Sequence, residues 1–161
     1  MDLHQELAKP FNVAQLHWRV GAMTKDKTKA IALAYIDARD VMKRLDDVLG
    51  SDKWQNRYSH VTDSIAICEI GIFINDNWIW KSDGAGDSAV EAEKGRISDA
   101  FKRTAVHFGI ARYLYKLPNI WCPVDQYKKL IMVDGMPQNV KLPEWATPEG
   151  YKKIIQQRIG E

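Results

Sequence analysis

Cysteine is scarce in this sequence. Cys68 and Cys122 are the two cysteines among its 161 residues, and they form no CxxC pair. This usage gives no basis for a disulfide framework or a zinc ribbon, and it is typical of proteins in a reducing compartment. We therefore expect a cytoplasmic protein.

Long apolar runs are also missing. The longest spans only residues 65–74 and contains Glu69, whereas a helix needs roughly 20 apolar residues to cross a bilayer. The first residues, from Met1 to Glu6, place acidic side chains where a signal peptide needs a basic region. We expect neither a membrane span nor a signal peptide.

The sequence lacks the motifs that hold nucleotides and metals. No GxxxxGK[ST] occurs, which argues against an ATP-driven motor. Residues 84–89 match GxGxxA, but Asp83 and Asp87 would repel a pyrophosphate, so we interpret this stretch as a turn and a helix N-cap. The four histidines have no i, i+4 partner histidine and no neighbouring cysteine. We expect no cofactor and no bound metal.

Charge of one sign is not in excess. The chain has 23 Lys and Arg against 21 Asp and Glu, a net charge of +2, and 45% of its residues are hydrophobic. Such a chain should fold, and at this length we expect residues 1–161 to form a single domain. A polyanion would have to be bound through the placement of basic side chains, because the total charge is close to zero.

Hydrophobic periodicity predicts an α+β fold, with an antiparallel β-meander packed against a long helix and additional short helices. Both faces of the middle strand, residues 65–74, are largely apolar. We expect one face to pack on a helix and the other to be covered by a subunit or a loop. The expected strands are residues 16–23, 30–36, 54–60, 65–74, 78–81 and 129–133, with a hairpin turn at 75–77. The expected helices are residues 2–8, 37–49, 88–108 and 110–117, and a last helix that begins near Thr147.

The first group of basic residues lies in and before one loop. Lys25, Lys27 and Lys29 crowd the loop between the first two expected strands, and Arg19 lies on the strand before it. Tyr35, on the second strand, has a ring that could stack on a base or pack in a sheet. These residues are candidates for contacts with nucleic acid.

The second group lies on the long helix. Helical spacing places Arg103, next to Lys102, near Arg96 and His107 and away from the apolar stripe. These cations would form a basic edge that suits a phosphate backbone. In the alternative reading, Asp99 pairs with Lys102 at i, i+3 and with Arg103 at i, i+4, and the helix side is merely solvated.

Several segments resemble the Rad52 family of single-strand-annealing proteins, most of all its phage-type members. The clearest similarity is in the long-helix region, and a shorter one is the strand and helix start at residues 33–37. The matching stretches are Lys9-Pro10-Phe11, Trp18-Arg19-Val20, Asp83-Gly84-Ala85-Gly86, Glu93-Lys94-Gly95, residues 98–105, Phe108-Gly109 and Arg112-Tyr113-Leu114. The resemblance covers about residues 9–117, and the role of residues 118–161 is unassigned.

The resemblance implies a β-β-β-α core that assembles into a homo-oligomeric ring, binds single-stranded DNA in a basic groove and anneals complementary strands without ATP. It implies a non-enzymatic protein of recombination and DNA repair in a bacterial or phage-infected cell, with a single-strand-binding protein as a possible partner. The groove residues carried over by position are Arg19, Tyr35, Lys102 and Arg103, with Lys94 and Arg96 as further candidates.

The sequence also departs from the family. The second, outer DNA-contact surface of the family uses a lysine near the hairpin turn, where this chain has Asn75 and Asp76. We therefore do not expect the outer site. Eukaryotic members also carry a long C-terminal extension that recruits other proteins, and because this chain ends soon after its core we expect the annealing core alone. Two other functions stay open from the residues: a small metal-dependent nuclease built on scattered acids, and a protein-interaction module that binds no DNA.

Overall fold

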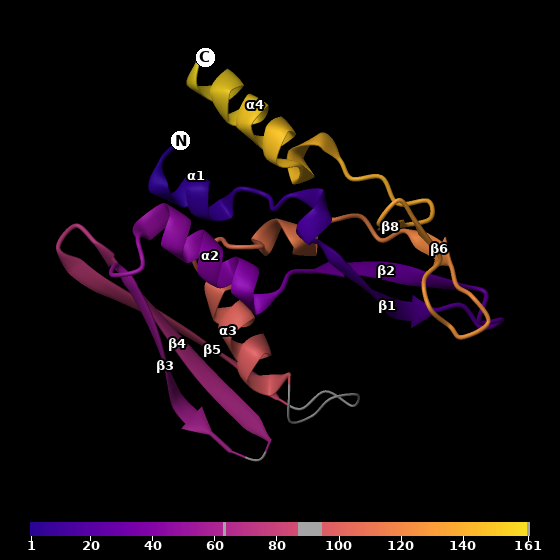
Figure 1. The fold of residues 1–161 in the computed structure, drawn as a ribbon, viewed down its shortest axis with the longest axis horizontal. Helices are drawn as coiled ribbons and strands as arrows, with labels where there is room; N and C mark the ends of the chain where they lie inside the picture. Colours follow the sequence, from indigo (N-terminus) through magenta and orange to yellow (C-terminus); the bar gives the residue numbers. More distant parts are fainter. Residues whose placement is uncertain (63, 87–94, 161) are drawn as a thin grey trace. The chain divides into compact units, whose positions relative to one another are not determined.

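The structure of the chain is a computed structural model that describes residues 1–62, 64–86 and 95–160. It divides into two compact units. Unit 1 consists of Met1–Lys9 and Ala38–Arg112, and unit 2 consists of Pro10–Asp37 and Tyr113–Glu161. Each unit has its own antiparallel sheet and its own buried core (Figure 1).

Unit 1 contains the expected meander, in which the strands pair in the order β3-β4-β5. Every pairing in this sheet is antiparallel, as the sequence predicted. The helices of the unit are α1 (Leu3–Ala8), α2 (Ala38–Leu49) and α3 (Arg96–Val106), and its strands are β3 (Trp54–Val61), β4 (Ile65–Ile74) and β5 (Asn77–Gly86).

The middle strand β4 alternates between a buried face and a more open one. On the buried face the side chains of Cys68, Ile70 and Ile72 are at most 2% exposed. The strand continues into β5 through Asn75 and Asp76, which both have positive φ values (51° and 63°). Two such residues form the type I′ turn that matches the twist of a hairpin, so the turn signal in the sequence located this hairpin correctly.

Helix α3 covers the buried face of the meander (Figure 1). Ala100, Phe101, Thr104 and Ala105 form its buried side. The Thr104 hydroxyl lies 2.7 Å from the carbonyl oxygen of Ala100 and 3.1 Å from that of Cys68 in β4. A buried hydroxyl needs such partners, and here they tie the helix to the sheet. The expected packing of strand 65–74 on the long helix is confirmed.

Helices α1 and α2 are joined through Arg44. Its guanidinium Nη1 donates to the carbonyl oxygens of Leu7 (3.0 Å) and Glu6 (3.4 Å), and also to that of Lys9. The last carbonyls of a helix have no partner within the helix, so a cation placed there satisfies them and complements the helix dipole. Asp2 and Gln5 form a capping box at the other end of α1.

Unit 2 is built around the hairpin of β1 (His17–Met23) and β2 (Lys29–Tyr35), and β6 (Trp121–Pro123) pairs with the other edge of β2. Helix α4 (Pro148–Ile159) begins at Thr147, whose hydroxyl accepts from the Gly150 amide as an N-cap. The smaller elements are η1 (Val13–Gln15), η2 (Arg112–Lys116), β7 (Met132–Val133), β8 (Met136–Pro137) and η3 (Glu144–Ala146). All lie in unit 2 except the first residue of η2, Arg112, which ends unit 1.

Some expected boundaries differ from the structure. Strand β5 reaches Gly86 instead of ending at Lys81, so the stretch expected to be a turn at 83–86 is paired strand. Helix α3 begins at Arg96, and residues 88–94 of the expected helix lie outside the described residues. The segment 110–117 contains the 3-10 helix η2, and the expected strand 129–133 is reduced to β7.

Among the helices of the described residues, none combines the length and the apolar character that crossing a bilayer requires.

Burial predicts how two isoleucines of unit 1 contribute to stability. Ile70→Ala leaves a cavity between β4 and α3 and should lower the free energy of unfolding by about 2–5 kcal/mol. Ile97→Ala is the matched control, because the Ile97 side chain is 44% exposed, and it should change the free energy by about 0.5 kcal/mol or less. Chemical denaturation followed by tryptophan fluorescence measures both. Equal losses would contradict the packing of β4 on α3.

Candidate nucleic-acid interface

The β1–β2 hairpin of unit 2 ends in a loop that carries three lysines. The loop is closed by hydrogen bonds from the Thr24 amide to the Lys29 carbonyl (2.9 Å) and from the Lys27 amide to the Thr24 carbonyl (3.0 Å). Lys27 has a φ of 61°, in the left-handed region. Lys25, Lys27 and Lys29 are all exposed. The loop and the first residue of β2 therefore present three exposed lysines within five positions of the chain.

The carboxylate of Asp26 orders this loop. It accepts hydrogen bonds from the Thr24 hydroxyl (2.7 Å), the Thr28 hydroxyl (2.8 Å) and the Thr28 amide (3.1 Å). These three hydrogen bonds lower the pKa of Asp26 below its ordinary value. Asp26 therefore stays ionised and shapes the backbone that presents the lysines.

Arg19 and Tyr35 lie on one face of the same hairpin. His17 pairs with Tyr35 across the two strands, and Arg19, two residues after His17, points to the same side. The His17 and Tyr35 rings stack with their centroids 5.3 Å apart and their planes at 25°. Ala30 and Ala32 lie on the opposite face, and both are buried. Packing of that face leaves Arg19 and Tyr35 exposed.

The cations predicted in unit 1 lie on α3. The Lys102 ammonium is 3.6 Å from Asp99, as the i, i+3 spacing predicted. Arg103 does not make the pairing with Asp99 that the alternative reading expected. Instead its Nε lies 3.5 Å from the carboxylate of Asp83 in β5. Arg96 is the first residue of the helix and is partly buried.

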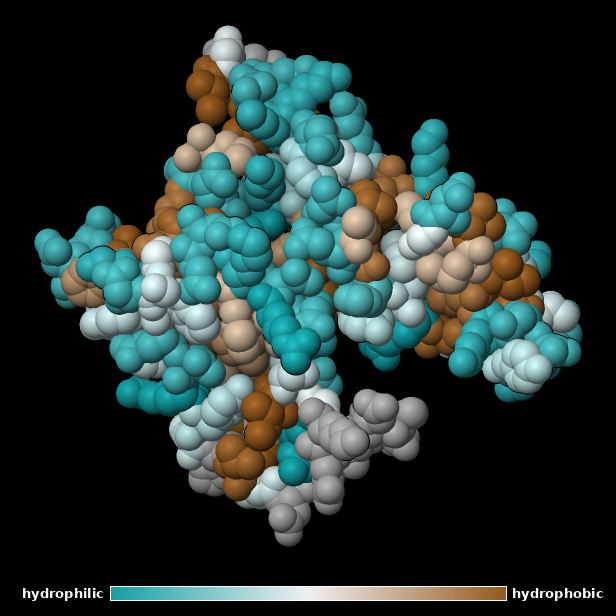
Figure 2. Space-filling view, viewed as in Figure 1, coloured by the Kyte–Doolittle hydropathy of each residue, from teal (hydrophilic) through white to brown (hydrophobic). Residues whose placement is uncertain are grey.

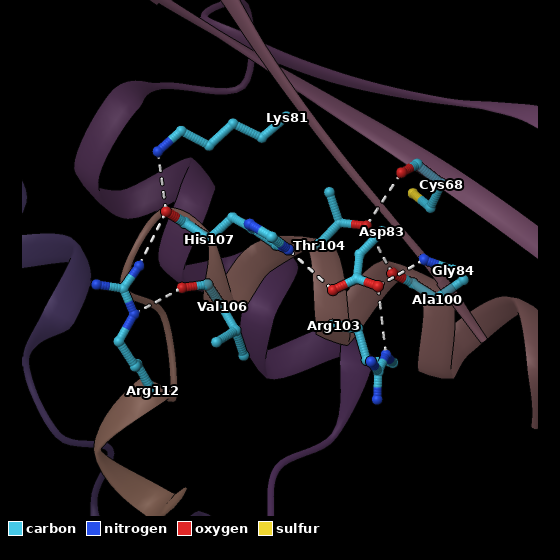
Figure 3. Close-up of polar contacts among 10 residues, drawn as sticks. All are labelled: Cys68, Lys81, Asp83, Gly84, Ala100, Arg103, Thr104, Val106, His107 and Arg112. Atoms are coloured by element: carbon cyan, nitrogen blue, oxygen red, sulfur yellow. Dashed lines mark hydrogen bonds and ion pairs between the residues drawn. The ribbon is translucent and has the colours of Figure 1, made fainter.

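Asp83 also contacts His107, just after the end of α3 (Figure 3). The His107 Nε2 is 2.8 Å from Asp83 Oδ2, and the Gly84 amide donates to Asp83 Oδ1 at 2.7 Å. Partial burial works to raise the pKa of Asp83, but the bonds from His107 and Gly84 and the charge of Arg103 lower it overall. Sequence reasoning assigned Asp83 to a turn and missed this cluster. If the strand expected at residues 78–81 had been extended to residue 86, the cluster could have been predicted, because the register then pairs Asp83 with Cys68, which lies beneath α3.

The predicted site residues fall into two groups. Each unit brings its own group together, on the hairpin in unit 2 and on α3 in unit 1. Lys94 lies outside the described residues. Unit 2 carries Arg19, Lys25, Lys27, Lys29 and Tyr35, and unit 1 carries Arg96, Lys102 and Arg103.

Unit 1 has a further cluster that sequence reasoning missed, on the sheet face opposite α3. The Arg57 guanidinium lies over the Trp80 ring (4.0 Å to the centroid), and its Nε is 2.8 Å from Glu69. The Lys53 ammonium lies 4.6 Å from the centroid of Phe73. Such contacts are cation–π interactions. The available signal was the strand alternation, which places Arg57, Glu69 and Trp80 on one face.

The described residues offer neither a cluster of metal ligands nor an exposed thiol. Within residues 1–62, 64–86 and 95–160 no three His, Cys, Asp or Glu side chains are grouped to hold a metal ion. Cys68 and Cys122 are both buried, and burial raises the pKa of each thiol.

The chain matches one protein-family model and is similar to two single-stranded DNA-binding proteins. A family model described as "Rad52/22 family double-strand break repair protein" matches residues 1–130. The chain is 33% identical over 154 residues to the single-stranded DNA-binding protein DdrA of Deinococcus radiodurans. It is 34% identical over 154 residues to the protein of the same description in Deinococcus deserti. Both matches cover 92% of this chain, and they cover 69% and 71% of the two relatives. The chain therefore belongs to the Rad52/22 family, as the resemblance predicted.

The hydrogen bonds of the lysine loop predict a pH dependence. Because the pKa of Asp26 is lowered in the folded loop, the stabilisation of the loop is present above the ordinary value of 3.8 and is lost as the pH falls through the lower folded value. A carboxyl-detected NMR titration should place the Asp26 transition below 3.8. Thr28→Val removes one of the hydroxyl donors and should move the transition upward. A wild-type transition at or above 3.8 would show that these hydrogen bonds do not form.

Proposed function

We propose that this protein binds single-stranded DNA and anneals complementary strands in recombination and DNA repair, without ATP and without a catalytic step. One observation carries the proposal. In each unit, basic side chains lie on an element whose other side is packed into a core: exposed ones on the β1–β2 hairpin, and half-buried Lys102 beside exposed Arg103 on α3. Membership of a double-strand break repair family and the similarity to two single-stranded DNA-binding proteins support it.

The basic side chains suit the phosphate backbone. Lysine and arginine that neutralise phosphates release counterions, which gives affinity without sequence preference and a strong dependence on salt. In this proposal Arg19, Lys25, Lys27 and Lys29 contact phosphates in unit 2, and Lys102 and Arg103 do so in unit 1. Contacts confined to the backbone leave the bases free to pair with a second strand.

Tyr35 has a separate role in the proposal. Its ring is exposed and already stacks on His17. Stacking on an aromatic ring is a sequence-tolerant way to hold a base. We therefore assign Tyr35 to contact with a base next to the phosphates held by Arg19. Lys94 and Arg96 are further candidates for phosphate contacts.

We also propose that the protein works as a homo-oligomeric ring in the cytoplasm of a bacterial or phage-infected cell. A single chain has a net charge of +2, but repetition of its cationic elements around a ring would build a continuous basic groove. Val61 and Ile65, on either side of the connection between β3 and β4 in unit 1, are each at least 40% exposed, and Figure 2 shows apolar surface near one end of the unit's sheet. Apolar surface of this kind favours self-association. A single-strand-binding protein is a candidate partner.

We further propose that both units belong to a single annealing domain, with the family-like core at about residues 9–117. The segment 118–161 contributes to it through β6, which pairs with β2 and thereby supports the hairpin that carries the lysine loop.

Strand annealing without nucleotide tests the proposal. Two complementary oligonucleotides, one with a donor dye and one with an acceptor, are mixed with the protein in magnesium and without ATP. We expect faster duplex formation than for the oligonucleotides alone, with both strands intact on a denaturing gel. Shortened strands would indicate the nuclease, and the absence of DNA binding at low salt would indicate the interaction module.

A matched pair of variants tests the assignment of α3 to DNA. K102A/R103A should bind a single strand more weakly and should lower the slope of log affinity against log salt by about 1.4, because each phosphate contact contributes about 0.7. K152A/R158A removes the same two charge types from exposed positions of α4 and should keep the wild-type slope. The same loss in both variants would mean that only total charge matters.

A further inference from the structure

Asp83 lies between two basic side chains, one on α3 and one at its end. One carboxylate oxygen is 3.5 Å from Arg103 Nε, and the other is 2.8 Å from His107 Nε2. The Asp83 side chain is 26% exposed, whereas those of Arg103 and His107 are 55% and 45% exposed. In Figure 3 both basic groups point toward the carboxylate, from one side of the helix. Solvent protons and an incoming phosphate can therefore reach the two basic partners more readily than they reach the carboxylate.

Other ionisable side chains lie around this cluster. Lys81 of β5 and Arg112 both donate to the His107 carbonyl at 3.0 Å. Across the sheet, Asp83 of β5 pairs with Cys68 of β4, and Cys68 pairs in turn with Tyr58 of β3. Burial raises the pKa of the Cys68 thiol and raises the pKa of Tyr58 to about 12.

Two further carboxylates among the described residues have basic partners of their own. On α3 the Asp99 carboxylate lies 3.6 Å from Lys102. Glu69 of β4 pairs with Arg57 on the other face of the sheet. Imidazole is the side chain that ordinarily titrates between about pH 5 and pH 8. Among the groups named around Asp83, His107 is the one imidazole.

We propose that Asp83 is a positioning residue that competes with DNA phosphate for Arg103, and that protonation of His107 relieves this competition. Binding of single-stranded DNA at α3 therefore strengthens as the pH falls from about 8 to about 6. The inference rests on the proposed DNA-binding function. It adds a dependence of the affinity for single-stranded DNA on pH, which arises from Asp83 of β5 and from His107 just after α3.

The sign follows from the charges. With a neutral His107, the Asp83 and Arg103 charges cancel, and a phosphate that approaches Arg103 also meets the Asp83 carboxylate. With a protonated His107, the three groups together carry one positive charge, and the carboxylate is shared between two cations. Phosphate and proton then favour each other's binding, because each stabilises the state that the other binds.

The expected size is modest because the groups are partly exposed. One added unit charge close to a bound phosphate changes the affinity by about two- to fivefold at low salt, and salt reduces the effect. Replacing Asp83 with Asn removes the competing charge outright and should strengthen binding by a similar factor at pH 8.

Oligo(dT) is the probe, because its bases do not change charge in this pH range and the pH dependence must come from the protein. Affinity is measured at low salt and at pH 8 and pH 6 for the wild type, H107Q, D83N and D83N/R103A. H4Q is the matched control, since His4 is an exposed histidine on α1 of the same unit. Calorimetry of the wild type in buffers with different ionisation enthalpies reports proton uptake on binding without any variant.

The wild type and H4Q should bind more tightly at pH 6, and H107Q should lose most of this gain. D83N should bind more tightly than the wild type at pH 8, and D83N/R103A should show no such gain. An H107Q profile equal to that of the wild type, or no proton uptake by the wild type, would overturn the inference. If the wild type binds no oligo(dT) at either pH, the proposed function itself fails.

Discussion

The packing of α3 against the meander is the constraint on which the cationic side of unit 1 depends. The helix buries Phe101, Thr104 and Ala105 against β4, and the Thr104 hydroxyl binds a carbonyl oxygen of that strand. Because an α-helix repeats every 3.6 residues, this fixes the rotation of the helix about its axis. Arg103 and His107 are then held toward the end of β5, where Asp83 lies. The Thr104 hydroxyl and the buried apolar side of α3 thus determine the positions of the basic side chains on this helix.

Much of the fold could be predicted because local signals agreed with the tertiary packing. Every second residue of β4 from Ala66 to Ile72 is buried, and Asn75 and Asp76 supply the positive φ values of its hairpin turn. Thr147 caps α4 as expected. The extension of β5 to Gly86 was missed because Gly84 and Gly86 carry a turn signal. In the folded chain the ladder with β4 overrides that local preference.

The basic residues of the candidate site could be predicted from the sequence, but the ion-pair partner of Arg103 could not. The loop lysines and the Lys102 and Arg103 pair can be read from the sequence, and so can the pairing of Lys102 with Asp99, because it lies within one helix. The partner of Arg103 could not be found in this way. Asp83 lies 20 positions earlier in the numbering, and the contact exists only because β5 runs beside α3. Long-range ion pairs of this kind depend on topology, which helix spacing does not encode.

The most direct test of the account is a map of which lysines single-stranded DNA covers. Lysine acetylation followed by mass spectrometry, with and without oligo(dT) at low salt, reports each ammonium group separately. The account predicts protection of the loop and α3 lysines, and no protection of exposed lysines on other helices. The first set is Lys25, Lys27, Lys29 and Lys102, and the second is Lys43 and Lys152. Uniform protection of both sets, or protection of the second alone, would contradict it.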